Sequence, residues 1–354
     1  MAAVEELCQT FRDHVAVAGS RAPMLAALSA AIADRPAIAE LLAAAPTTQQ
    51  SPVLLLAAIH AEVLGDPACE LAAWFPTTAA APRTDDLGRA LERFTGARAD
   101  ALRRIVATRV TQTNEIGRCG LLLPVLGLLA GEAGPLGLLD VGASAGLNLQ
   151  IDRYAYEYRP GGRVGAAAPV TLAVATRGPV PVPDRVPAIG ARLGIDRQPV
   201  DIGDAAEVAW LRACVWPDQR DRFARLAAAL EIARANPVEV RRGDAVADLA
   251  AGVETVAAGG HPVVVNTWVL SYLTARERAA YLSELRRIGA ARDLSWVYAE
   301  SPAQTPELPH PRQLAGQDMT VIGAVCWRGG EEQTRHVARA HPHGYWMHWE
   351  AGQA

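Results

Sequence analysis

The sequence predicts an α/β protein: a helical region at the N-terminus, then a mostly parallel β-sheet with an inserted β-hairpin. Three observations support this prediction. Residues 1–134 carry helix signals, residues 135–354 alternate between strand-like and helix-like segments, and a glycine-rich turn follows the first strand-like segment. Strands that alternate with helices are typical of a parallel sheet whose two faces are both covered.

The helical region, residues 1–134, is expected to contain several helices and to cap the functional site. Residues 24–33 (MLAALSAAIA) and 53–64 (VLLLAAIHAEVL) are rich in Ala and Leu, which are strong helix formers. Pro23 and Pro52 directly precede these segments, where first-turn prolines are favoured. Because no period-two run of β-branched residues interrupts the region, it predicts no strand.

The sheet region, residues 135–354, contains short apolar segments that predict buried strands. These segments are residues 136–141, 188–195, 238–241, 261–265 and 294–299. Two longer segments between them predict helices, a long one over 210–235 and an amphipathic one over 274–288.

Two segments interrupt the alternation of strands and helices. Residues 154–187 contain Gly161–Gly162 and several prolines, which predicts an inserted β-hairpin with a loop. Residues 320–349 alternate around Gly329–Gly330, which predicts an antiparallel hairpin that closes one edge of the sheet.

The composition argues against several classes of protein. A chain of 354 residues with a formal charge of −4 lacks the basic footprint of a protein that binds nucleic acid or anionic membranes. The N-terminus carries no basic segment before an apolar core, and the apolar run at 120–130 is too short to span a bilayer. We therefore expect a cytoplasmic protein. All 34 basic residues are arginine, which excludes Schiff-base and P-loop lysines.

The turn after the first strand, within LLDVGASAGLNL (138–149), fits two different enzyme motifs. Gly142 to Gly146 match G-x-S-x-G, the turn that presents a serine nucleophile in α/β-hydrolases, with Ser144 as the nucleophile. The same residues, started at Asp140, match D-x-G-x-(G)-x-G, the first nucleotide-binding loop of Rossmann-like methyltransferases. Ser144 then stands at the middle glycine of that motif.

The rest of the chain favours the second interpretation. Several strands precede the nucleophile in α/β-hydrolases, whereas helices are expected before Ser144, and no H-G-G-G oxyanion segment lies upstream. Asp140 would also place a carboxylate near a developing oxyanion, which opposes that chemistry. A dinucleotide-binding fold fits less well, because G-x-G-x-x-G requires glycine where Ser144 and Leu147 stand.

S-adenosylmethionine is the nucleotide ligand that suits this loop. It carries an ammonium and a sulfonium group but no phosphate, so a carboxylate beside it is favourable. Gly142 and Gly146 let the backbone approach a ligand closely. We therefore expect Asp140, Gly142, Ser144 and Gly146 to hold the methionine end of this cofactor.

Acids that follow the later strands predict the rest of the cofactor site. Asp196 is expected to accept the ribose hydroxyls; it lies 56 residues after Asp140, where about 20 is usual, and the inserted hairpin accounts for the excess. Asp244 and Ala245 follow the third strand and are expected to contact the adenine. Further cofactor-binding candidates are Arg118, Asn148 and Asn266.

The chain resembles, through its whole length, the bacterial domain-of-unknown-function family 2332. The likeness lies in QTNEIGRC (112–119), LLDVGASAGLNLQIDRYAYEY (138–158), GIDRQPVDI (194–202), WLRACVWPDQ (210–219), RRGDA (241–245) and NTWVLSYL (266–273). The resemblance implies a Rossmann-like class I methyltransferase sheet with a helical N-terminal region, and it implies no particular substrate.

The polar segment TQTNEIGR (111–118) supplies candidates for substrate chemistry. A helix is predicted from about residue 100 to residue 113. If the polar segment is also helical, Thr111, Glu115 and Arg118 share one face beside Asn114. We expect Glu115 to act in catalysis and to meet a cationic part of the substrate, and Arg118 to meet a carboxylate.

Residues at the ends of two later strands complete the predicted site. Glu300 is a second catalytic candidate, because it ends the strand LSWVYAE, where ligands collect in open α/β folds. Thr267 and Trp268, together with Asn114, are expected to bind substrate. Two carboxylates favour an amine- or guanidine-bearing acceptor. The C-terminal HPHGYWMHW (341–349) offers no carboxylate or Cys at ligand spacing, so we expect no metal site.

The sequence therefore predicts an S-adenosylmethionine-dependent methyltransferase that acts on a small molecule. Two alternatives remain: a serine hydrolase with Ser144 as its nucleophile, and a protein that binds S-adenosylmethionine or S-adenosylhomocysteine without catalysis. The sequence does not identify the acceptor, and it leaves a homodimer open.

Overall fold

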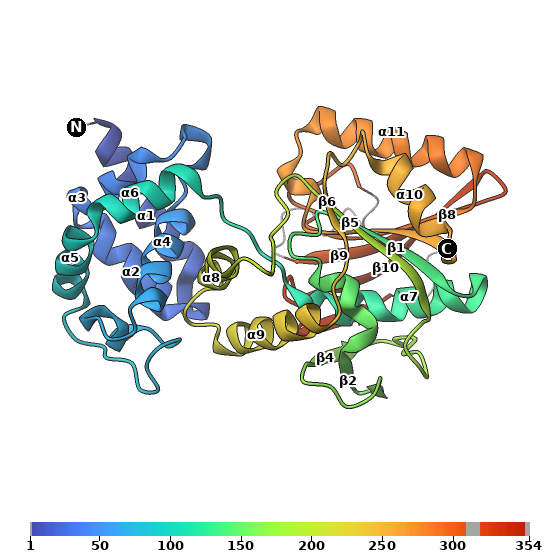
Figure 1. Ribbon diagram of the computed structural model, residues 1–354, viewed down its shortest axis with the longest axis horizontal. Coiled ribbons are helices and arrows are strands. Elements are labelled where there is room, and N and C mark those ends of the chain that lie inside the picture. Colours follow the sequence, from blue (N-terminus) through green and yellow to red (C-terminus); the bar gives the residue numbers. More distant parts are fainter. Residues whose placement is uncertain (1, 309–318, 351–354) are drawn as a thin grey trace. The chain divides into compact units, whose positions relative to one another are not determined.

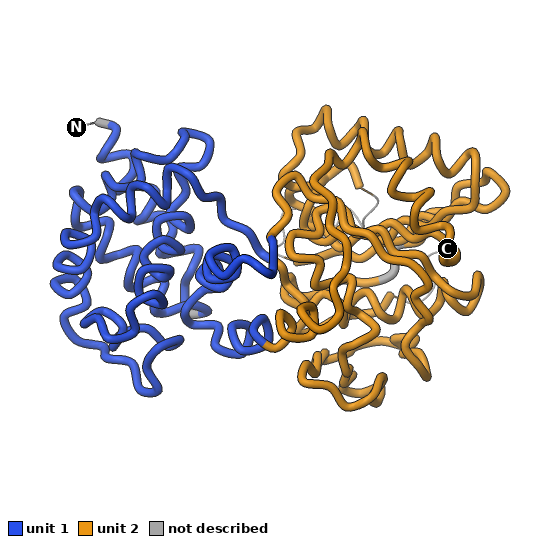
Figure 2. Tube along the Cα trace, viewed as in Figure 1, with its two compact units in different colours: residues 1–113, 201–227 blue, residues 114–200, 228–354 orange. Residues whose placement is uncertain are grey.

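The chain divides into a helical unit and a sheet unit, each described here by itself (Figure 2). The computed structural model describes residues 2–308 and 319–350. The helical unit comprises residues 1–113 and 201–227, and the sheet unit comprises residues 114–200 and 228–354.

The helical unit is built from short helices around an apolar core. Phe11, Leu28, Leu55 and Trp210 are among the side chains buried in this core. Its helices are α1 (Ala2–Ala18), α2 (Pro23–Ala33), α3 (Pro36–Ala39), α4 (Pro52–Gly65), α5 (Leu87–Ala97), α6 (Ala99–Thr108) and α8 (Ala205–Ala213). Its 3-10 turns are η1 (Gly19–Arg21), η2 (Glu40–Ala44), η3 (Thr47–Gln49) and η4 (Glu70–Trp74).

Two helices that the sequence predicted differ in the structure. Helix α6 ends at Thr108 and residues 109–115 are not helical, so the predicted helical face shared by Thr111, Glu115 and Arg118 is wrong. The β-branched residues at 110, 111 and 113 disfavour a helix there. The predicted helix over 210–235 is two helices, α8 and α9 (Arg220–Ala235), because Pro217 lies between them.

The sheet unit contains an eleven-stranded sheet in the order β3-β2-β4-β11-β10-β9-β8-β7-β1-β5-β6 (Figure 1). The strands are β1 (Leu136–Val141), β2 (Ala155–Arg159), β3 (Gly162–Val164), β4 (Thr171–Arg177), β5 (Ile189–Asp196), β6 (Val240–Arg242), β7 (His261–Thr267), β8 (Leu294–Glu300), β9 (Thr320–Arg328), β10 (Glu331–Ala340) and β11 (Trp346–Trp349). The mixed α/β class and all five predicted strands are confirmed.

The strands β6, β5, β1, β7 and β8 pair in parallel. From β1 the chain continues to β5 and β6 on one side, and then to β7 and β8 on the other. The strand order therefore reverses beside β1, and the carboxyl ends of all five strands lie at the same edge.

Helices cover both faces of this part of the sheet (Figure 1). Helices α10 (Leu249–Ala257) and α11 (Ala275–Ala291) lie on one face, and α7 (Cys119–Ala133) lies on the other. Strands β1 and β8 are buried along their whole length. Leu139, Tyr281 and Trp296 are part of the core on the α10 and α11 side.

The inserted and C-terminal segments extend the sheet. The insertion forms the predicted hairpin, β2 and β3, and a further strand, β4, which pairs in parallel with β2. The predicted hairpin of β9 and β10 is confirmed, but the prediction that it closes an edge is wrong. Strand β11 pairs with β10 on one side and with β4 on the other, so the sheet continues through the insertion to β3.

The unit boundary and the apolar helix both differ from expectation. The predicted boundary at residue 134 falls at 113, because α7 packs against β4, β8 and β9 of the sheet. The 3-10 turn η5 (Ile116–Arg118) continues into α7, so residues 116–133 are long and apolar enough to cross a bilayer by length and composition. The apolar run at 120–130 is thus part of a longer apolar helical stretch than the sequence pattern indicated. About 67% of the stretch is buried, as in a core helix.

The start of α11 provides a test of local stability. Thr274 accepts a hydrogen bond from the Glu277 N–H, and the Glu277 carboxylate accepts one from the Thr274 N–H, which is a capping box. We expect Thr274→Ala to lower the free energy of unfolding by about 1 kcal/mol. Thr274→Ser, which keeps the acceptor oxygen, should retain the wild-type value in chemical denaturation. Equal stability of all three proteins would contradict the assignment of this cap.

Candidate functional site

The predicted site residues gather at the carboxyl ends of the parallel strands, within the sheet unit. Asp140 belongs to β1, Asp196 to β5, Thr267 to β7 and Glu300 to β8, each at or next to the last residue of its strand. Ligands bind outside the carboxyl ends of strands in open α/β sheets, beside the point where the strand order reverses. The edge next to β1 is therefore the candidate site.

The loop after β1 has a backbone that requires glycine. Gly142 has φ +85° and Gly146 has φ +69°, and a Cβ at either position would overlap valine side chains. Ser144 has φ +52°, and Trp268 after β7 has φ +57°. Non-glycine residues rarely adopt this region, and such strained backbone is enriched at functional sites.

Asp140 is a buried carboxyl group that lacks a hydrogen-bond partner. It is 2% exposed, and neither carboxylate oxygen accepts a hydrogen bond from any described residue. Burial, and to a smaller extent the nearby Asp196, raise the pKa of Asp140 to about 7, although Arg118 acts in the opposite direction. An unpartnered buried carboxyl group is costly to stability, which makes Asp140 a candidate functional group.

Asp196 and Ser144 connect the loop to β5. The Asp196 carboxylate accepts the Ser144 N–H at 2.8 Å and the Gln198 N–H at 2.7 Å. The Ser144 hydroxyl is buried and makes no hydrogen bond within the described residues. No histidine or carboxylate of the described chain therefore engages it as a catalytic base.

Glu300 organises the turn after β7. One of its oxygens accepts the N–H groups of Val269 and Leu270, at 2.9 and 3.3 Å. The other oxygen is buried and has no hydrogen-bond partner among the described residues. Burial raises the pKa of Glu300 to about 7, although the backbone donors and Arg118 act in the opposite direction.

Arg118 joins three segments of the site. Its guanidinium donates to the Thr267 carbonyl at 2.8 Å and to the Pro342 carbonyl at 3.0 Å. It also lies 5.6 Å from the centre of the Trp268 ring. The side chain is buried, so the site holds a cation close enough to lower the pKa values of Asp140 and Glu300.

Glu115 is paired with a histidine that the sequence did not predict as a site residue. One Glu115 oxygen accepts the Gly117 N–H at 2.8 Å, and the other lies 3.4 Å from Nδ1 of His343. Glu115 is 3% exposed, whereas a quarter of the His343 side chain is exposed. The Glu115 carboxylate and the His343 imidazole lie within ion-pair distance, although these two atoms form no hydrogen bond with each other. A histidine beside a buried carboxylate is a candidate general base.

The turn between β10 and β11 brings His343 to this edge. Gly344 has φ +78°, and its Cα lies so close to the Gly117 backbone that a Cβ would overlap it. A Cβ on Gly117 would likewise overlap the His343 carbonyl. The sequence showed a histidine-rich turn at 341–345, but only the direction of β10 places that turn at the carboxyl edge.

The remaining predicted residues also lie near this edge, and the three asparagines among them form hydrogen bonds with other groups of the protein. The Asn114 side chain accepts the Leu147 N–H at 3.2 Å, and the Asn148 amide donates to the Thr267 hydroxyl at 3.2 Å. The Asn266 amide donates to the carbonyl of Val141 at 3.1 Å. The Asn266 oxygen accepts hydrogen bonds from Tyr281 and Trp296, each at 2.7 Å.

Asp244 and Ala245 follow β6, which is the edge strand of the sheet next to β5. One Asp244 oxygen accepts the N–H groups of Val246 and Ala247, and the other accepts Arg197 at 3.1 Å. These hydrogen bonds hold the pKa of Asp244 below its usual value. Their contact with a nucleotide remains a prediction, as do the other ligand contacts. No group of His, Cys, Asp and Glu among the described residues is arranged to hold a metal ion.

A family comparison covers nearly the whole chain. The model of a family described as "Uncharacterized protein conserved in bacteria (DUF2332)" matches residues 9–349. The chain belongs to this DUF2332 family. A comparison with curated proteins found no match. The family assignment that the sequence motifs suggested is thus confirmed, and it adds no activity to the DUF2332 fold.

The two buried carboxyl groups predict an unusual dependence of stability on pH. Between about pH 4 and about pH 7, Asp140 and Glu300 keep their protons in the folded state, whereas the unfolded chain releases them. The folded state then binds more protons, so the free energy of unfolding should fall as the pH rises through this window. Removing one of these groups should flatten that fall.

We expect Asp140→Asn to be more stable than the wild type at about pH 8, by roughly 1 to 4 kcal/mol, since it removes a buried charge. Chemical denaturation at several pH values measures this difference. Asp184→Asn, which changes an exposed acid in the insertion, is the control and should match the wild type. A less stable Asp140→Asn protein at that pH would show that the carboxylate is compensated internally.

Proposed function

We propose that this DUF2332 protein is an S-adenosylmethionine-dependent methyltransferase that acts on a small molecule. The observation that carries the proposal is Asp140, a buried carboxyl group without a hydrogen-bond partner beneath a glycine loop. A cationic ligand at this position would compensate the charge that the protein leaves open.

The residues present fit this cofactor on three counts. Gly142 and Gly146 give the loop after β1 the positive-φ backbone of a glycine turn at the strand end. Asp196 lies beside the same loop, at the end of the neighbouring strand, where a residue that binds the ribose of the cofactor is expected. Read outward from the reversal point, the parallel strands have the order of a doubly wound nucleotide-binding sheet.

The bound cofactor would supply an electrophilic methyl group, and the protein would hold the acceptor in line with it and exclude water. Asp140 would face the ammonium and sulfonium charges, and Arg118 would face the carboxylate of the methionine end. Asp196 would accept the ribose hydroxyls, while Asp244 and Ala245 would lie near the adenine.

The acceptor chemistry follows from Glu115, His343 and Glu300. Glu115 accepts the Gly117 N–H and lies 3.4 Å from His343, so its proposed role is to orient the imidazole. His343 can then remove a proton from an amine or hydroxyl nucleophile. The unpartnered Glu300 oxygen favours a cationic part of the acceptor, which keeps an amine- or guanidine-bearing molecule as the proposed class.

The hydrolase alternative lacks support in the geometry. Ser144 has the positive φ of a strained turn, but its hydroxyl makes no hydrogen bond to a histidine within the described chain. A serine nucleophile requires an adjacent base. A protein that binds the cofactor without catalysis remains the second candidate, because the loop alone would serve that purpose.

Cofactor binding is tested by thermal unfolding with S-adenosylmethionine and with S-adenosylhomocysteine. Each ligand, at about one hundred times its dissociation constant, should stabilise the fold by roughly 2.7 kcal/mol, which raises Tm by about 5 to 10 °C. Asp140→Asn should abolish most of this rise while keeping or increasing the Tm without ligand. Asp184→Asn should respond as the wild type. If neither ligand changes the Tm of the folded wild-type protein, the proposal fails.

Catalysis is tested by forming S-adenosylhomocysteine with a panel of small amines, guanidines and phenols. We expect His343→Asn and Glu115→Gln to reduce kcat by about one hundredfold, with cofactor affinity within about twofold of the wild type. His261→Asn, at the opposite end of β7, is the control and should keep the wild-type kcat. Binding without turnover over the whole panel would favour the non-catalytic alternative, and unchanged kcat in both variants would exclude His343 as the base.

A further inference from the structure

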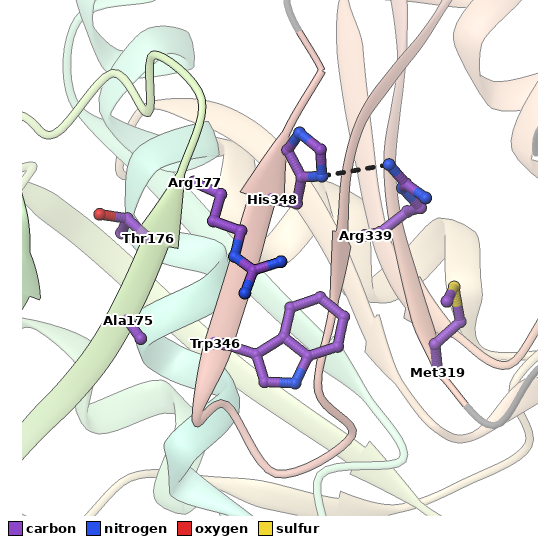
Figure 3. A pocket seen from close by; sticks show the side chains of 7 residues that line it. All are labelled: Ala175, Thr176, Arg177, Met319, Arg339, Trp346 and His348. Atoms are coloured by element: carbon purple, nitrogen blue, oxygen red, sulfur yellow. Dashed lines mark hydrogen bonds between the residues drawn. The ribbon is translucent and has the colours of Figure 1, made fainter.

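A pocket lies on the sheet itself, on strands that the proposed methyl transfer does not use. It has a volume of about 400 Å³, within the usual range for small-molecule sites. Strands β4, β11 and β10 form its floor, and Met319 borders it (Figure 3). The buried side chain of Val174, on the other face of β4, meets Gly120 of α7, so the pocket opens on the face away from α7.

Three side chains, Arg177, His348 and Arg339, form a row across the pocket floor, and Trp346 lies beside this row. His348 of β11 is paired with Arg177 of β4 on one side and with Arg339 of β10 on the other. Trp346 lies two residues before His348, opposite Ala175, and so faces the same way. Figure 3 shows the Arg177 guanidinium between the rings of His348 and Trp346 in that view.

The side-chain groups that this row and Trp346 present to a ligand are hydrogen-bond donors. Arg339 donates to Nδ1 of His348 at 3.1 Å, and a guanidinium has no acceptor, so the imidazole carries its proton on Nε2. Arg177 is exposed and has no hydrogen bond or ion pair within the described residues. The Trp346 indole N–H likewise has no acceptor there, and its ring supplies a flat apolar wall.

The charge balance limits the ligand to a weakly anionic one. Arg339 forms an ion pair with Glu350, so the carboxylate offsets one of the two guanidinium charges of the row. His348 is neutral in the tautomer that accepts from Arg339. Among the described residues that line the pocket, Arg177 is the one cation without a compensating carboxylate, and it matches one ligand carboxylate, which a guanidinium binds through two parallel hydrogen bonds. A dianion such as a phosphate monoester would face the nearby Glu350 with insufficient positive charge.

We propose that this pocket binds a small aromatic carboxylate, with its carboxylate on Arg177 and its ring against Trp346. The donor groups of Arg177 and Trp346, the flat aromatic wall and the pocket volume together select this class of ligand. The proposal is independent of the methyltransferase assignment, because none of these residues belongs to the cofactor loop or to the strand-end carboxyl groups.

The test is binding of 2-naphthoate to the full-length protein near neutral pH, measured by calorimetry and by quenching of tryptophan fluorescence. We expect saturable binding with Kd below about 1 mM. Arg177→Gln should weaken binding at least about tenfold, since it removes the bidentate partner at an exposed position. Arg163→Gln, an exposed arginine on β3, is the matched control and should bind as the wild type.

Two further ligands and one variant separate the possible outcomes. The neutral 2-naphthamide should bind at least about tenfold more weakly than 2-naphthoate, because it lacks the charge that Arg177 requires. Trp346→Leu should remove most of the affinity for 2-naphthoate and most of the fluorescence quenching that binding causes. No binding up to about 10 mM, equal binding of the amide, or an unaffected Arg177→Gln protein would each overturn the proposal. Tighter binding of 2-naphthyl phosphate would overturn the choice of a carboxylate.

Discussion

The buried guanidinium of Arg118 connects segments that are far apart in the sequence and meet at one edge of the sheet. It donates to carbonyl groups at the end of β7 and in the turn between β10 and β11. Because arginine has five donors and no acceptor, one side chain can fix several backbone carbonyls at once. Both Glu115 and His343 depend on this link, since one lies three residues before Arg118 and the other follows Pro342.

The same guanidinium makes two buried carboxyl groups tolerable. Asp140 and Glu300 each retain at least one oxygen without a hydrogen-bond partner among the described residues. Such groups reduce stability, and Arg118 only partly offsets the cost, as the raised pKa values of both indicate. The cationic ligand proposed above would account for the retention of these groups, because substitution by an amide would be favourable for folding alone.

The sequence predicted those parts of the fold that local patterns determine. The five strands, the glycine loop and the first-turn prolines of α2 and α4 follow from short-range preferences, and the structure contains them. The pairing of β11 with β4 joins residues about 170 apart, and no local pattern specifies it. The Glu115–His343 pair has the same origin, because its two residues meet only when η5 and the β10–β11 turn are packed together.

The extended sheet gives the C-terminal segment two roles. The turn at 341–345 carries His343 to the strand-end site, and β11, which starts directly after it, carries Trp346 and His348 to the pocket on the sheet. Gly344 and Gly117 hold the turn in place through a backbone contact that has no room for a side chain. One short segment of the chain, from the turn at 341–345 through β11, therefore contributes side chains both to the strand-end site and to the pocket on the sheet.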